Sequence, residues 1–96
     1  MVEKIVRTFD FSEDVLYGKA KSIVGVQMEK RLADFNPKIT WNDGDKKGLF
    51  NVKGILGSIN VNGGTLSVII DKIPMMLKPF KGKIIDSITK IVDKVE

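Results

Sequence analysis

Residues 58–71 have the sequence SINVNGGTLSVIID, in which two alternating stretches flank Asn62-Gly63-Gly64. The Asn-Gly-Gly sequence favours a tight hairpin turn, because such turns need positive φ, which glycine and asparagine adopt readily. On either side, Ser58–Asn62 and Thr65–Asp71 place apolar side chains at every second position, as in strands with one buried face. The inward side chains of the second strand are Leu66, Val68 and Ile70.

Two more strands are predicted before this hairpin. Lys38–Asn42 alternates around Ile39 and Trp41, and Leu49–Lys53 places Phe50 and Val52 on one face. Polar residues 43–48 form a turn between them. The stretch Gly54-Ile55-Leu56-Gly57 is interpreted as a tight connection or a β-bulge.

The first third of the chain predicts a strand followed by a helix. Val2–Phe11 alternates and is rich in β-branched and aromatic residues. Ser12 is a suitable N-cap for a helix at about 12–34, which ends before Asn36-Pro37. Gly18 and Gly25 are unusual inside a helix, and either close approach to a sheet or sequence drift explains them.

The last helix shows the clearest amphipathic pattern. Pro79 suits its first turn, where a missing N–H is tolerated. The order β-α-β-β-β-β-α predicts an α+β fold, with an antiparallel sheet and two helices packed on one face. At 96 residues, the chain is expected to form a single domain over 1–96. The apolar stripe of this helix consists of Phe80, Ile84, Ile88, Ile91 and Val95.

The composition argues against catalysis. The chain has no cysteine and no histidine, which excludes disulfides, Cys/His zinc sites and Ser-His triads. No acidic pair or nucleophile motif stands out, so we expect a protein that is not an enzyme and has no cofactor. Asn42, Asp43 and Asp45 could suggest a metal loop, but calcium loops need more oxygen ligands, so we interpret them as a solvated turn. The N-terminus lacks a signal peptide's apolar stretch and no apolar run could span a bilayer, which predicts a cytoplasmic protein.

The net charge of +4 is concentrated in one segment, residues 72–83, which we call the junction. It contains four lysines and no acid, while the other 12 basic residues are balanced by 12 acidic ones. Its apolar residues could plug the end of the sheet, since methionine fills irregular gaps, or form an exposed contact patch for an apolar and anionic surface. The predicted contact residues are Met75, Met76, Leu77, Lys78, Phe80, Lys81 and Lys83.

Two other functions fit the pattern. A sheet that grips a helix could carry an apolar small molecule, and a sheet edge or the methionines could form a homodimer interface. Nucleic-acid binding is not favoured, because the charge excess is small and Phe80 is expected in the core. Trp41 is interpreted first as a core anchor. The walls of a carrier cavity would be Trp41, Phe50, Ile59, Val68, Ile84 and Ile88, joined by Val52 and Val61.

The order of these features resembles the polyhydroxyalkanoic acid system proteins, a family of small bacterial proteins. The similarity extends from Ile5 to about Val92 and contains no catalytic motif. It implies association with polyester storage granules, whose apolar surface lies inside the cytoplasm. One departure is Phe9, at the position where family members carry a histidine. The matching features are Ile39–Trp41, Gly44, Asp45, Phe50, Gly54, Gly57, Ile59–Val61, Ser67–Ile70, Leu77, Lys81 and Ile84.

Overall fold

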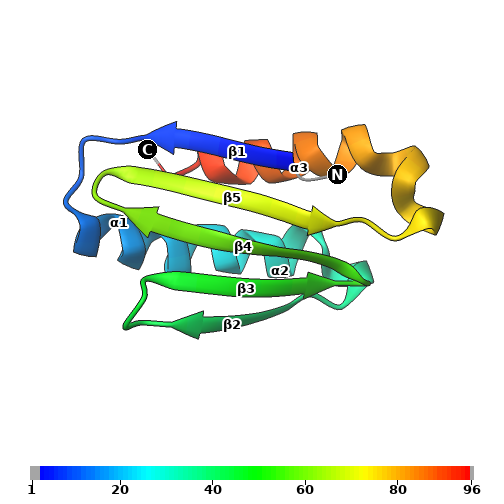
Figure 1. Cartoon of the computed structure of the whole chain (residues 1–96), viewed down its shortest axis with the longest axis horizontal. Coiled ribbons are helices and arrows are strands. Elements are labelled where there is room, and N and C mark those ends of the chain that lie inside the picture. Colours follow the sequence, from blue (N-terminus) through cyan, green and yellow to red (C-terminus); the bar gives the residue numbers. More distant parts are fainter. Residues whose placement is uncertain (1–2, 96) are drawn as a thin grey trace.

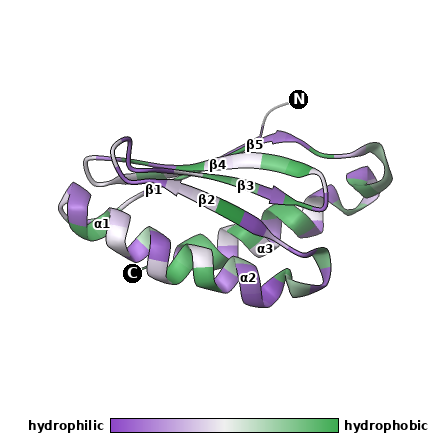
Figure 2. Ribbon diagram, turned by 90° about the horizontal axis from the view of Figure 1, so that it is seen from below, coloured by the Kyte–Doolittle hydropathy of each residue, from purple (hydrophilic) through white to green (hydrophobic). Residues whose placement is uncertain are grey.

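The computed structural model describes residues 3–95, which form a five-stranded antiparallel sheet with helices on one face (Figures 1 and 2). The strand order is β1-β5-β4-β3-β2, so the first strand pairs with the last. The α+β class, the element order and the one-sided helical layer are as predicted. The strands are β1 (Glu3–Thr8), β2 (Lys38–Asn42), β3 (Lys47–Val52), β4 (Ile55–Asn62) and β5 (Thr65–Lys72).

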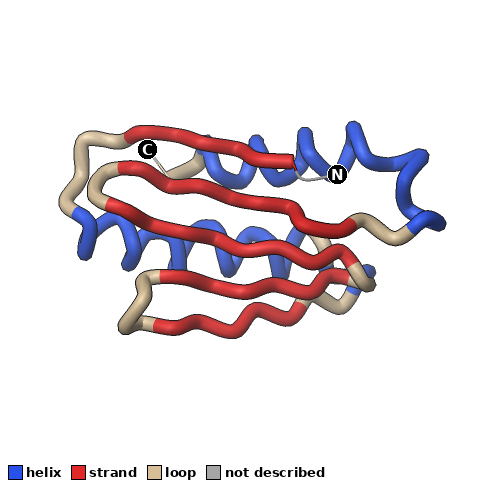
Figure 3. The backbone as a smooth tube through the Cα atoms, viewed as in Figure 1, coloured by secondary structure: helices blue, strands red, loops and turns tan. Residues whose placement is uncertain are grey.

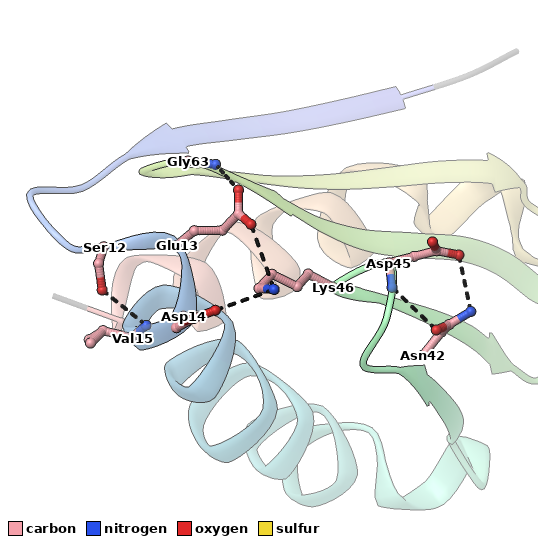
Figure 4. Close-up of polar contacts among 8 residues, drawn as sticks. All are labelled: Ser12, Glu13, Asp14, Val15, Asn42, Asp45, Lys46 and Gly63. Atoms are coloured by element: carbon pink, nitrogen blue, oxygen red, sulfur yellow. Dashed lines mark hydrogen bonds and ion pairs between the residues drawn. The ribbon is translucent and has the colours of Figure 1, made fainter.

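The predicted first helix is a single coiled segment with an irregular middle. It consists of α1 (Glu13–Lys19), a π-helical segment η1 (Ala20–Gly25) and α2 (Val26–Arg31). A short 3₁₀ turn, η2 (Ala33–Phe35), follows, and Asn36 ends it with φ of 52°. Ser12 is the N-cap as predicted, because its Oγ accepts a hydrogen bond from the Val15 N–H at 3.3 Å (Figure 4).

Several strand boundaries differ from the prediction. β3 begins at Lys47 instead of Leu49 and ends at Val52, and β5 extends by one residue to Lys72. The first strand ends at Thr8, and the Phe9 N–H bonds instead to the Gly64 carbonyl in the β4–β5 turn at 2.8 Å. Its predicted start at Val2 lies outside the described residues. β4 begins at Ile55, because Lys53 and Gly54 both take positive φ, 53° and 87°, and close a two-residue turn. The pairing of β4 with β5 shifts register between Leu56 and Gly57, within the stretch where a tight connection or a bulge is predicted.

The final helix starts later than its apolar stripe suggests. A 3₁₀ segment, η3 (Met75–Phe80), precedes α3 (Lys81–Asp93). Pro79 therefore lies inside η3 and not in the first turn of α3. A proline ring in an α-helix clashes with the carbonyl four residues earlier, so the chain becomes α-helical only after it. Phe80 is 51% exposed, and its assignment to the core is wrong.

The core lies between the sheet and the helices, and polar contacts join the two layers at their rim. Glu13, at the start of α1, accepts a hydrogen bond from the Gly63 N–H at 2.7 Å and pairs with Lys46 at 3.7 Å (Figure 4). Lys46 also pairs with Asp14 at 3.3 Å. These contacts attach the first helix to the β2–β3 and β4–β5 turns.

Candidate functional site

The junction forms one end of the molecule. The chain measures 38 × 22 × 20 Å along its principal axes, and the segment from the end of β5 to the start of α3 lies at one extreme of the long axis (Figures 1 and 3). Ile73 and Pro74 leave the sheet, η3 reverses the chain, and α3 returns across the same face that α1 and α2 cover. The Leu77 N–H donates to the Pro74 carbonyl at 2.9 Å and closes the first turn of η3.

The apolar side chains of the junction divide between the surface and the core. Met75 and Met76 are 81% and 80% exposed, and Phe80, at the end of η3, is half exposed. Leu77 is only 9% exposed and belongs to the core. The junction is thus partly buried and partly exposed. Leu77 belongs to the core, and we call the three exposed residues Met75, Met76 and Phe80 the Met patch.

The lysines of the junction are not equivalent. Lys72, Lys78 and Lys83 are exposed, whereas the Lys81 ammonium lies 2.6 Å from the Glu3 carboxylate of β1. The junction contains no acidic residue of its own, but the folded chain brings the acidic Glu3 of β1 next to it. Pairing of β1 with β5 brings Glu3 to this end, because Glu3 is opposite Ile70. Sequence inspection missed Glu3, since the neighbour of an edge strand is not visible in local patterns.

An open hollow of about 460 Å³ lies between the end of β5 and η3. The sequence patterns predict no site here, and they predict Asp71 only as the last residue of a strand. A second, smaller hollow of about 300 Å³ lies elsewhere, between η2 and the β3–β4 turn. The residues that line the first are Asp71, Lys72, Ile73, Pro74, Met75, Lys78 and Lys81.

The six residues proposed as carrier walls lie in or against the core. Five of them are buried, and neither hollow is lined by any of the six. Trp41 is half-buried, and its ring packs between two glycines. A Cβ placed on Gly48 would lie 2.7 Å from the ring, and one placed on Gly25 would lie 3.1 Å from it. These five side chains belong to the core, and Trp41 is partly buried against it. The five buried members are Phe50, Ile59, Val68, Ile84 and Ile88.

The polar β2–β3 turn is occupied by protein contacts. Asp43 accepts hydrogen bonds from the Tyr17 hydroxyl at 2.6 Å and the Lys21 ammonium at 2.9 Å, which lower the pKa of its carboxyl. Burial, followed by the hydrogen bond to Asp43, raises the pKa of Tyr17 to about 12. Asn42 and Asp45 bond to each other (Figure 4). Among residues 3–95, no group of three or more acidic side chains is arranged to hold a metal ion.

The fold and this end define a class: a small α+β protein with a helix-backed antiparallel sheet and an exposed apolar and basic tip. Comparison with protein families makes the assignment specific. Residues 17–95 match the model described as "Putative polyhydroxyalkanoic acid system protein", and the chain belongs to this family. No curated protein and no solved structure matches the chain. No helix within residues 3–95 is long and apolar enough to cross a membrane.

Proposed function

We propose that this chain is a non-enzymatic cytoplasmic protein that attaches to polyester granules, or to another apolar and anionic surface, through the Met patch and its lysines. The observation that carries the proposal is the exposure of Met75 and Met76, each about four-fifths accessible. Both belong to η3, in the segment that lies at one tip of the molecule (Figure 1). The family supports the choice of surface, because its description places its members in the polyhydroxyalkanoic acid system.

The Met patch can supply the apolar part of such attachment. Full burial of a methionine or phenylalanine side chain contributes roughly 1.5–3 kcal/mol. Both methionines start almost fully exposed, so most of this free energy is available on contact. Methionine is also flexible and can adapt to a surface without regular structure.

The lysines can supply the electrostatic part. Lys72, Lys78 and Lys83 surround the Met patch in the chain, and charged side chains with long apolar stems suit an interface between water and an apolar phase. Carboxylate or phosphate groups at the surface would be their partners. Attachment to an anionic surface should therefore weaken as salt screens these charges.

The charges of α3 also favour an external anion. The first turn of α3 contains Lys81 and Lys83 and no acid. The positive end of a helix dipole favours acids there and disfavours cations, by about 0.3–1 kcal/mol per charge. Stability therefore does not explain Lys83, whereas an anionic partner does.

The test is cosedimentation of the purified protein with polyester particles, and with neutral and anionic lipid particles, at low and high salt. The triple variant Met75→Gln/Met76→Gln/Phe80→Gln should stay folded, because these side chains are exposed, and should lose particle binding. A matched control, Val15→Gln/Val26→Gln/Leu49→Gln, removes three exposed apolar side chains outside the Met patch and should bind like the parent. Equal binding by both triple variants would refute the proposal.

Dimerisation is the competing use of the Met patch. Sedimentation velocity over a range of protein concentrations distinguishes dimerisation from attachment to particles. If the parent protein is a dimer that binds no particle, and the triple Met patch variant is a monomer, then the Met patch is a dimer interface.

A further inference from the structure

The hollow beside η3 is open to solvent and has an apolar side. Its volume of about 460 Å³ lies within the range of about 300–1,000 Å³ that is common for small-molecule pockets. Ile73, Pro74 and Met75 form its apolar part. Pro74 is held against the β3–β4 turn, because a Cβ on Gly54 would lie only 2.8 Å from the Pro74 Cγ. The wall is therefore supported by the sheet.

The polar side chains around this wall include both signs of charge. Lys72 and Lys78 are exposed, and neither forms an ion pair with a carboxylate within residues 3–95. Lys81 also borders the hollow, but its positive charge is already paired with the Glu3 carboxylate. Asp71 adds one carboxylate, which can accept a hydrogen bond but repels an anion.

We propose that this hollow binds an aliphatic hydroxy acid, either free or as the end of a polyester chain. In this arrangement Lys72 and Lys78 hold the carboxylate, Asp71 accepts a hydrogen bond from the hydroxyl, and the alkyl chain lies on Ile73, Pro74 and Met75. The inference rests on the proposed function for the choice of acid class, and it adds a specific site to a general surface.

The charge pattern separates this ligand from its closest competitors. A multiply charged phosphate would gain little from the apolar wall and would be repelled by Asp71. A plain fatty acid would satisfy the lysines and the wall but would leave Asp71 without a donor. A molecule with a carboxylate, a nearby hydroxyl and an alkyl chain matches all three parts.

The experiment is calorimetric titration of the full chain with sodium 3-hydroxyoctanoate, sodium octanoate and inorganic phosphate. The parent should bind the hydroxy acid best. Lys72→Gln/Lys78→Gln should weaken it by roughly tenfold or more, as expected when charge-assisted bonds to a carboxylate are lost. Lys30→Gln/Lys94→Gln removes the same charge elsewhere and should leave binding within about twofold.

Asp71→Asn provides the specific readout. The neutral amide no longer repels an anion, so octanoate should bind more tightly. It also accepts a weaker hydrogen bond from the hydroxyl than a carboxylate does, so the preference for the hydroxy acid should shrink. Equal affinity of the parent for both acids, or a preference that survives Asp71→Asn, would overturn the proposal.

Two further experiments distinguish a free hydroxy acid from a polyester chain end as the ligand, and test this proposal separately from the granule proposal. A hydroxyoctanoate oligomer with a free carboxylate should compete with the monomer if the site takes chain ends, and its methyl ester should compete poorly. Met76→Gln/Phe80→Gln should lose particle binding but keep hydroxyoctanoate binding, since neither residue lines the hollow. Particle binding without hydroxy acid binding would reject the site and leave the granule proposal standing.

Discussion

At the residue scale, the environment of Trp41 explains two glycines that the sequence leaves unexplained or ambiguous. Gly48 is opposite Trp41 in the β2–β3 pair, and Gly25 faces the same ring from the π-helical segment. Close approach is therefore the reason for Gly25. It is not the reason for Gly18, because a Cβ there would meet nothing within 4 Å.

Gly48→Ala should lower the free energy of unfolding by about 1–3 kcal/mol, because the new methyl group would displace the Trp41 ring. Gly18→Ala should raise it by up to about 1 kcal/mol, because alanine stabilises the exposed helix. Urea denaturation monitored by Trp41 fluorescence measures both. Destabilisation of similar size by the two substitutions would contradict this account of the ring.

Tyr17 is the only tyrosine, so its phenol can be titrated without ambiguity. In the folded protein its pKa is raised from 10.0 to about 12. The hydroxyl therefore supports folding fully below pH 10, and this contribution should be lost as the pH rises through 12. Ultraviolet titration should give a lower pKa for Asp43→Asn, while Asp45→Asn should match the parent, because Asp45 bonds to Asn42 and not to Tyr17.

At the element scale, η3 and α3 combine an exposed apolar surface with an unfavourable helix start. Leu77 attaches the segment to the core, and Pro79 delays α-helix formation until Lys81. The result is a turn that exposes the two methionines next to Leu77. The two ends of α3 also differ in a way that can be measured, since Lys83 lies in its first turn and Lys94 is its C-cap.

Removal of one positive charge should have opposite effects at the two ends of α3. Lys83→Gln should stabilise the protein by about 0.3–1 kcal/mol and weaken attachment to anionic particles. Lys94→Gln should destabilise it by a similar amount and leave attachment unchanged. Thermal unfolding and particle cosedimentation of the same two samples provide the comparison. If Lys83→Gln leaves particle binding intact, Lys83 has no role in attachment.

At the scale of the whole molecule, the position of the Met patch predicts the orientation of the bound protein. The Met patch and the β4–β5 turn lie at opposite ends of the 38 Å axis (Figure 1). The protein should therefore attach end-on, with the sheet extending away from the surface. The face of the sheet opposite the helices would then remain in water.

Because the chain has no cysteine, single-cysteine variants can carry a polarity-sensitive fluorophore. A probe at Met76→Cys should shift to the blue when particles are added, as the dye enters an apolar environment. A probe at Asn62→Cys, next to the β4–β5 turn, should not respond. A response at both positions would show that the protein lies flat on the surface.

Local sequence patterns determined most of the secondary structure. Alternation at 38–42 and 65–71, the Asn62-Gly63-Gly64 turn, the Ser12 cap and the apolar stripe of the last helix all depend on neighbours within a few residues. For the same reason they predicted the class of fold and a distinctive junction. The errors were also local: the positive φ at Lys53 and the 3₁₀ geometry around Pro79 lack a strong signal in the residue types.

Only the tertiary structure decided which side chains of the junction are buried, exposed or paired. The sequence shows two methionines and a leucine in a row, but packing against the sheet buries Leu77 and leaves Met75 and Met76 in water. It shows an acid-free run of lysines, but the pairing of β1 with β5 brings Glu3 against Lys81. Burial and ion pairing depend on which distant segments meet, and this information is carried by the packed chain rather than by any one stretch of it.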